Sequence, residues 1–99
     1  MGAKIEKIAV LIKDVDQQYE GLRSSLGLLL EAASVHMYVL DHEIENMDEA
    51  YRDNMEFIDE MEGERFSNNP ANIEKYGFKP VTMEELLFNL KAVDLIIPF

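Results

Sequence analysis

The chain has 99 residues, which is enough for one domain (residues 1–99) with a single hydrophobic core. Its apolar content of 47% excludes a disordered chain, and no apolar run approaches the roughly 20 residues that span a bilayer. The net charge of −11 argues against nucleic acid or a membrane surface as a partner, because both carry negative charge. The apolar run behind the first lysines is too short for a signal peptide, so we expect a cytoplasmic protein.

The first predicted element is a strand within residues 7–14, which read Lys7-Ile8-Ala9-Val10-Leu11-Ile12-Lys13-Asp14. The apolar run shows neither strict alternation nor helical spacing, and it is rich in branched side chains. This pattern is typical of a strand that is buried on both faces. Such a strand needs helices above and below it.

A helix is predicted next, because apolar residues recur at steps of three and four from Tyr19 to Ala33. Asp14 and Asp16 are the N-cap candidates, and the spacing extends the helix to Ser34. The second half of this helix is apolar nearly all round. We therefore expect this helix to pack against more than one neighbouring element, one of which could belong to another subunit.

A second strand is predicted over residues 35–40, parallel to the first and joined to it by a right-handed crossover. Residues 46–49 form a capping box with Asn46 as the N-cap. The helix that it opens is expected to run to about Glu62 and to stop at Gly63.

Two features of this second helix each allow two interpretations. Its apolar stripe is rich in methionine, which favours a core position at helical spacing but also suits an adaptable binding surface. Between Asp41 and Glu64 there are eleven acidic residues and one basic residue, Arg52. This acidic segment is either a solvated helix face or a docking face for a basic partner.

The last third of the chain is predicted to alternate short elements. Residues 65–67 suggest a short strand, and residues 71–76 suggest about one helical turn that Gly77 ends. A second capping box at residues 82–85 opens a helix through Lys91. Residues 92–99 form the last predicted strand, and its Pro98 indicates a position at the margin of the sheet.

The alternation of strands and helices predicts an α/β fold: a three-layer αβα sandwich with a mostly parallel open sheet and flavodoxin-like topology. The first strand should lie inside the sheet. Ligands in such sheets bind outside the carboxyl ends of the strands. The candidate ligand-binding crevice there contains Asp14, Asp16, Asp41, His42, Ser67 and Asn68.

The chemistry of this crevice is restricted. No glycine-rich phosphate motif is present, and Asp14 and Asp16 would repel an anion. A cation pocket of Asp14, Asp16 and Asp41 would resemble a phospho-acceptor receiver domain, but the later Asp and Lys of such domains are missing. His36 and His42 lie roughly 20 Å apart on an extended strand and cannot share a metal. We expect no metal site and no cofactor.

An enzymatic activity is not expected either. His42 beside Asp41 could act as an acid or base, but no nucleophile or oxyanion hole is identifiable around it. Ser67 lacks the nucleophile-elbow motif, and the chain has no cysteine. Catalysis by His42 with Asp41 is the remotest of the options.

The chain resembles the DsrE/DsrF-like family of sulfur-relay proteins, which includes the Tus and Dsr subunits. The resemblance rests on the opening strand, the leucine-rich helix around Leu28-Leu29-Leu30, the strand at 35–41 and the pair of elements at 82–99. It implies a flavodoxin-like sandwich that assembles into oligomers. Active members carry a persulfide on a cysteine just after the third strand, where this chain has Ser67 or Asn68. Serine cannot form a persulfide, because that chemistry requires a thiolate.

The resemblance therefore implies a cysteine-less, non-catalytic member that acts as a scaffold or interaction subunit. Its expected partners are proteins, either further copies of itself or paralogous subunits. The alternative is a small-molecule or metal-binding module that uses the carboxyl edge of the sheet.

Overall fold

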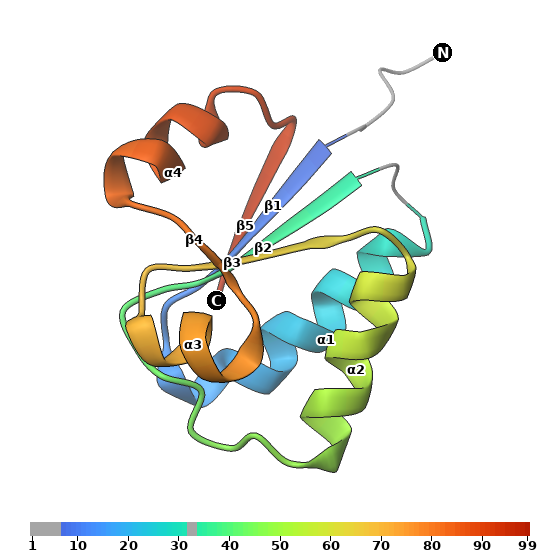
Figure 1. Cartoon of the computed structure of the whole chain (residues 1–99). Helices are drawn as coiled ribbons and strands as arrows, with labels where there is room; N and C mark the ends of the chain where they lie inside the picture. Colours follow the sequence, from blue (N-terminus) through green and yellow to red (C-terminus); the bar gives the residue numbers. More distant parts are fainter. Residues whose placement is uncertain (1–6, 32–33) are drawn as a thin grey trace.

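The computed structural model describes residues 7–31 and 34–99, which fold into one parallel sheet with helices on both faces (Figure 1). This confirms the predicted α/β sandwich. The elements in chain order are β1 (Lys7–Ile12), the 3-10 turn η1 (Val15–Gln17), α1 (Gln18–Leu29), β2 (Ser34–Val39), α2 (Glu49–Glu60), β3 (Glu64–Ser67), α3 (Pro70–Tyr76), β4 (Lys79–Pro80), α4 (Met83–Leu90) and β5 (Leu95–Pro98). No helix in the described ranges is long and apolar enough to cross a membrane.

The strand order is β4-β3-β2-β1-β5, and each neighbouring pair is parallel. The first strand lies inside the sheet and β5 lies at the margin, as predicted. The order differs from the flavodoxin order 2-1-3-4-5, in which the second and third strands lie on opposite sides of the first. Here β2, β3 and β4 follow β1 in one direction, and only β5 lies on its other side.

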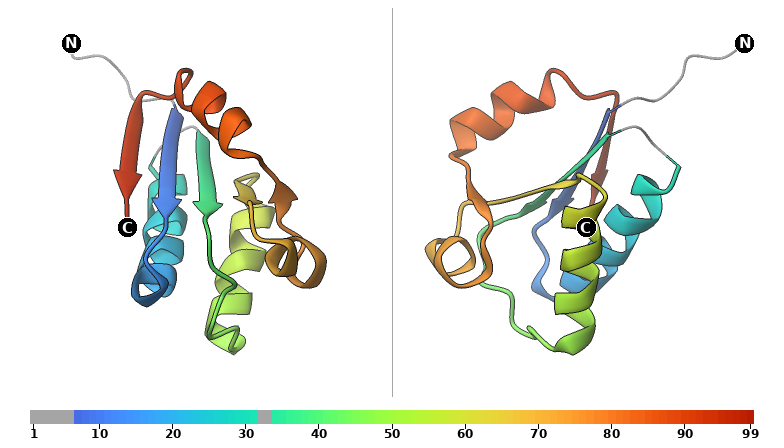
Figure 2. Two further views of the ribbon diagram at one scale, coloured as in Figure 1. Left: turned by 90° about the vertical axis from the view of Figure 1, so that its left-hand side faces the viewer. Right: turned by 45° about the vertical axis from the view of Figure 1, so that its right-hand side comes forward.

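This strand order decides which helices cover which face (Figure 2). Parallel strands are joined by right-handed crossovers, so three crossovers in one direction place their helices on the same face. α1 and α2 cover that face, and α3 packs against the same core through Ile73 and Tyr76. The last crossover runs in the opposite direction, which places α4 on the other face.

β1 supplies both cores from alternating positions. Ile8, Val10 and Ile12 enter the larger core with α1 and α2, whereas Ala9 enters the smaller core under α4. All four of these side chains are buried. This confirms the prediction that the opening strand is covered on both faces.

Gly21 permits the close contact between α1 and β1. A Cβ atom at Gly21 would overlap the side chain of Ile12, which is fully buried. Gly27 lies in the same helix but has open space around the position of a Cβ atom.

These two glycines give a matched prediction. Gly21→Ala should lower the free energy of unfolding by about 1–3 kcal/mol, because the added methyl overpacks the core. Gly27→Ala should raise it by up to about 1 kcal/mol, because alanine has the higher helix propensity. Urea denaturation measures both values. Equal stability of the two variants would show that α1 does not pack this closely against β1.

The first helix is shorter than predicted. α1 ends at Leu29, and Ser34 already belongs to β2; the predicted helical residues 32–33 lie outside the described part of the chain. Leu29 is buried in the larger core, whereas Leu30 is 71% exposed. Apolar residues are frequent both before and after the end of this helix, so the hydrophobic pattern does not mark where the helix ends.

The two ends of α2 also differ from the prediction. Its N-cap is Asp48, whose Oδ1 accepts from the Tyr51 N–H at 2.8 Å, and Asn46 lies two residues outside the helix. At the other end, Glu62 adopts the left-handed conformation (φ 63°) instead of Gly63. A Cβ atom at Gly63 would lie 2.7 Å from Leu29 and 2.8 Å from Ile58, so that glycine is needed for packing.

Glu62→Gly should therefore stabilise the protein by up to about 1 kcal/mol, because glycine adopts positive φ without the steric cost that a side chain carries. The control is Glu56→Gly at an exposed position in the middle of α2, which should destabilise the protein by about 1 kcal/mol. Thermal and urea unfolding measure both changes. A loss of stability in Glu62→Gly would contradict the left-handed conformation of Glu62.

The remaining elements largely follow the prediction. β3 and α3 form where expected, with Asn69 as the N-cap of α3 and the left-handed Gly77 as its C-cap. The capping box of α4 is complete: Thr82 and Glu85 each bind the other's backbone N–H. Tyr51, Met55 and Ile58 of the methionine-rich stripe are buried, as the core interpretation requires, whereas Phe57 in the helix and Met61 at its C-cap are exposed. β4 is a two-residue strand that the sequence did not indicate.

Candidate functional site

The loops after β1, β2 and β3 meet at the carboxyl edge of the sheet, as predicted. The backbone N–H of Asp41 donates to Asn68 Oδ1 at 2.7 Å, and Asn68 Nδ2 donates to Asp41 Oδ1 at 3.2 Å. Lys13 Nζ lies 3.8 Å from Asp41 Oδ2. Asp41 and Asn68 are therefore brought together, and each provides a hydrogen-bond partner for the other.

His42 follows Asp41 in a tight turn and has an exposed side chain. Asp41 has a positive φ of 69°, and the His42 N–H donates to the Leu40 carbonyl at 2.8 Å. The Asp41 carboxylate contacts Asn68 and Lys13. This geometry gives no support to catalysis by His42 with Asp41.

Ser67 is a structural residue and not part of an open crevice. Its hydroxyl is fully buried, donates to the Val39 carbonyl at 2.6 Å, and accepts from Asn69 N at 3.0 Å and Asn72 Nδ2 at 3.1 Å. A hydroxyl has one donor and two acceptor positions, so all of them are used. Its place in the predicted ligand-binding crevice is therefore not supported.

Asn72 organises this edge, although the sequence analysis did not identify it. The side chain is fully buried in α3, where Oδ1 accepts from the Ile44 N–H at 3.0 Å. Its Nδ2 donates to the His42 carbonyl at 3.0 Å and to Ser67. One amide thus holds the loop after β2 against the end of β3. An asparagine in a short polar helix carries no sequence signal for such a role.

Asp14 and Asp16 serve different purposes. Asp14 Oδ1 accepts from the Asp16 N–H at 2.9 Å and caps η1, as the sequence predicted. Asp16 lines a pocket further along this edge. Nowhere in residues 7–31 and 34–99 do three His, Cys, Asp or Glu side chains gather closely enough to hold a metal ion. The receiver-like cation pocket of Asp14, Asp16 and Asp41 is therefore not formed.

The amides at the end of β1 are also occupied. The Lys13 and Asp14 N–H groups both donate to the Phe99 carbonyl, at 2.9 and 3.2 Å. In open α/β sheets, the point where the strand order reverses is the usual ligand site. Here that point lies between β1 and β5, and its backbone donors already have partners.

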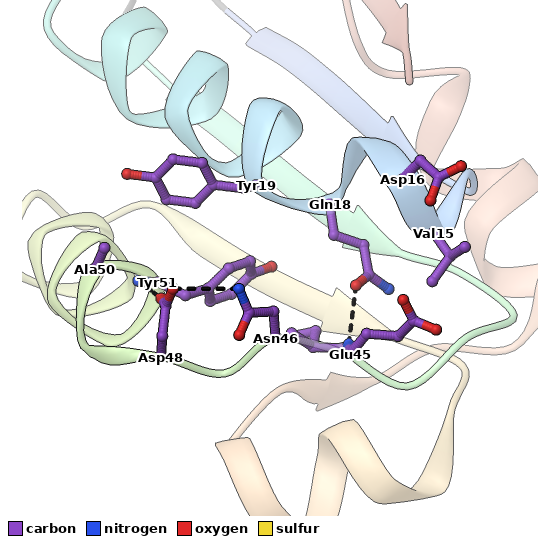
Figure 3. A pocket seen from close by; sticks show the side chains of 10 residues that line it. Val15, Asp16, Gln18, Tyr19, Glu45, Asn46, Asp48, Ala50 and Tyr51 are labelled. Carbon is purple, nitrogen blue, oxygen red and sulfur yellow. Dashed lines mark hydrogen bonds between the residues drawn. The ribbon is translucent and has the colours of Figure 1, made fainter.

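The pocket that Asp16 lines lies between the first turns of α1 and α2 and has a volume of about 330 Å³ (Figure 3). It is lined by two tyrosines, three carboxylates and a small number of other side chains. The ten residues are Val15, Asp16, Gln18, Tyr19, Ile44, Glu45, Asn46, Asp48, Ala50 and Tyr51. The sequence analysis placed only Asp16 of these in a ligand site.

Tyr51 is the unusual residue of this pocket. It is 1% exposed, and its hydroxyl has no hydrogen-bond partner among the described residues. Burial raises the pKa of this hydroxyl, and the opposing charge of Arg65 is the smaller effect. The phenol therefore stays neutral at physiological pH. The ring of Tyr19 lies 6.4 Å from that of Tyr51, tilted by 45°.

Gln18 fixes the loop that forms one wall of the pocket. Its Nε2 donates to the Glu43 carbonyl at 3.1 Å, and its Oε1 accepts from the Glu45 N–H at 3.0 Å. Because the side chain is buried, both bonds are shielded from water. Together with the Asn72–Ile44 bond, they hold residues 43–45 in one conformation.

His36 lies away from this edge, on the face of the sheet that α4 covers. It is half-buried, with its ring 5.6 Å from that of Phe66. Burial lowers the pKa of His36, Glu64 opposes that shift, and Lys7 and Lys79 reinforce it. His36 is therefore mainly neutral at pH 7 and belongs to the packing of that face.

Comparison of the chain with protein-family models, curated proteins and solved structures gives no match. Its function must therefore be inferred from the fold and the arrangement of its side chains. The DsrE/DsrF-like resemblance stays a hypothesis.

Asn72→Ala should lower the free energy of unfolding by about 2–4 kcal/mol, because it leaves the buried Ile44 N–H and the His42 carbonyl without their partner. The control is Asn54→Ala, which removes a single exposed bond to Tyr19 and should change stability by less than about 0.5 kcal/mol. Urea denaturation compares the two. A mild effect of Asn72→Ala would show that the network does not hold the loop.

Proposed function

We propose that this protein is a non-catalytic interaction subunit that pairs with a second copy of itself through α4. The observation that carries the proposal is a stripe of two large apolar side chains, flanked by opposite charges, on the outward face of that helix. The proposal agrees with the function implied by the DsrE/DsrF-like resemblance, and the absence of cysteine supports a role without sulfur transfer.

The outward stripe of α4 contains Glu84, Leu87, Phe88 and Lys91, which are spaced by three, four and seven residues and so share one helix face. Leu87 is 61% exposed and Phe88 is 72% exposed. These residues also line a shallow groove of about 530 Å³. Adjacent large apolar side chains at such exposure are typical of a protein–protein contact.

The sheet beneath α4 adds apolar surface. Among the described helices, α4 alone covers this face, and it has only eight residues (Figure 2). Ile96 of β5 pairs with Ala9 of β1, so both face the α4 side of the sheet, and Ile96 remains 44% exposed. Leu11 of β1 is only half-buried. A partner over α4 would bury part of this surface as well.

The arrangement of charges favours a second copy as the partner. Glu84 and Lys91 lie at equal distances along the chain from the Leu87–Phe88 pair. Two α4 helices packed antiparallel about a twofold axis would set Glu84 of each copy opposite Lys91 of the other, which is the self-complementarity of an isologous interface. The acidic α2 lies on the opposite face of the sheet, so the two acidic surfaces would stay apart.

Charge reversal tests this pairing. The wild-type protein should be a dimer in size-exclusion chromatography with light scattering. Glu84→Lys should weaken the dimer about tenfold, because two symmetry-related attractions become repulsions of a few tenths to 1 kcal/mol each. Adding Lys91→Glu should restore it. Phe88→Lys should weaken it by more than about a hundredfold.

The matched control is Phe57→Lys on α2, which replaces an equally large exposed phenylalanine on the other face and should leave the dimer unchanged. A wild-type protein that stays monomeric at high micromolar concentration would overturn the proposal. A dimer that responds to Phe57→Lys and not to Phe88→Lys would do the same.

A further inference from the structure

We propose that the pocket between α4 and the sheet binds a small molecule that joins an aromatic ring to a carboxylate. The pocket has a volume of about 340 Å³, which is at the small end of ligand sites in proteins. Its walls come from β1, β2, β3, α4 and the segment that joins α4 to β5. They consist of Lys7, His36, Phe66, Phe88, Asn89 and residues 92–93.

The short α4 leaves this part of the sheet open. The helix ends at Leu90, and the segment after it passes the amino end of β1, where the Asp94 N–H donates to the Lys7 carbonyl at 2.9 Å (Figure 2). His36 of β2 and Phe66 of β3 lie beneath this cover and are only half-buried. Both side chains therefore keep surface that a ligand can contact.

The rings in the lining favour an aromatic ligand. The His36 and Phe66 rings lie 5.6 Å apart and are tilted by 49°, and Phe88 contributes a third ring from α4. Phe88 is 72% exposed, so a ligand ring placed against it would remove much apolar surface from water. Aromatic rings at such spacings pair in offset or edge-to-face arrangements.

His36 offers a polar contact inside the pocket. Its ring packs against Phe66, and no described residue forms a hydrogen bond with it. Burial lowers the pKa of His36, so the ring is mainly neutral and carries one N–H donor. A carboxylate oxygen is a suitable acceptor for that donor.

The charge around the pocket selects an anion, although the chain as a whole is strongly acidic. Three carboxylates line the pocket between α1 and α2 and two line the groove on α4, whereas none of the described residues that line this pocket is acidic. Lys7 is its one charged residue, and it lies on the same face of the sheet as His36 of the neighbouring strand.

The acids near this pocket already have partners. Glu64, which acts on His36, pairs with Lys79 at 2.7 Å. The Asp94 carboxylate accepts from the backbone N–H of Lys7 at 2.9 Å and is not part of the lining. The Lys7 ammonium forms no ion pair with a described residue. It is therefore available to a ligand carboxylate.

The probe is 3-phenylpropionate, compared with the neutral 3-phenylpropan-1-ol and the cationic 3-phenylpropylamine of the same length. In calorimetric titration of the full chain, the carboxylate should bind with a dissociation constant of about 1 mM or tighter. The alcohol should bind several-fold more weakly, and the amine should not bind. Unspecific attraction to a chain of net charge −11 would give the opposite order, because it favours the amine.

Nuclear magnetic resonance locates the binding site, because the chain has two histidines. The ring C–H resonances of His36 should shift during the titration. His42 follows the other end of β2 and does not line the pocket, so its resonances should stay in place. Shifts of His42 alone, or equal shifts of both rings, would overturn the proposed site.

Two substitutions have matched controls. Ala92→Leu should weaken carboxylate binding more than about tenfold, because Ala92 is exposed and a larger side chain there fills part of the pocket. Ala50→Leu is the same change at an exposed position of α2 and should have no effect. Lys7→Glu should weaken binding several-fold, whereas Lys75→Glu on α3 should not.

The proposal is overturned if the amine or the alcohol binds as tightly as the carboxylate, if Ala92→Leu acts no more strongly than Ala50→Leu, or if no carboxylate binding is detected at millimolar concentration. It does not depend on the dimer, although Phe88 and Asn89 line both this pocket and the groove on α4. A monomeric wild-type protein that binds the carboxylate would overturn the dimer and support this site, whereas a dimer without binding would do the reverse.

Discussion

The burial of β1 on both faces is the constraint on which the rest of this structure depends. Ile8, Val10 and Ile12 enter one core and Ala9 enters the other, so helices must cover both faces of the sheet. Right-handed crossovers then distribute the helices unequally, because three of the four crossovers run in the same direction. One face receives α1, α2 and α3, and the other receives only α4. This unequal coverage leaves apolar side chains exposed on and beside α4.

The charges follow the same division. The acidic α2 lies on the face that has three helices, whereas the exposed Leu87 and Phe88 lie on the face that has one. A partner that approaches α4 therefore meets an apolar surface that has Glu84 on one side and Lys91 on the other. In the proposed dimer the acidic helices would point away from each other, which reduces the repulsion between two chains of net charge −11. The fold and the charge pattern both support α4 as the contact in the proposed dimer.

The carboxyl edge of the sheet behaves differently from the usual ligand crevice of an α/β protein. Its polar groups bind one another: Asp41 binds Asn68, and Ser67 and Asn72 form a buried network. These bonds stabilise the loops and leave few donors or acceptors for a ligand. The open space lies further along, between the first turns of α1 and α2. The residues that fix the loops thus also shape the neighbouring pocket.

The sequence by itself determined the α/β class, the internal position of β1, the end of α3 at Gly77 and the capping box of α4, because these depend on local patterns and residue types. Only the tertiary structure decided the strand order, the end of α1, the left-handed turn at Glu62 and the burial of Ser67. The pocket around Tyr51 belongs to this second group. Its walls come from segments that are distant in sequence, and a burial pattern cannot show which polar groups meet.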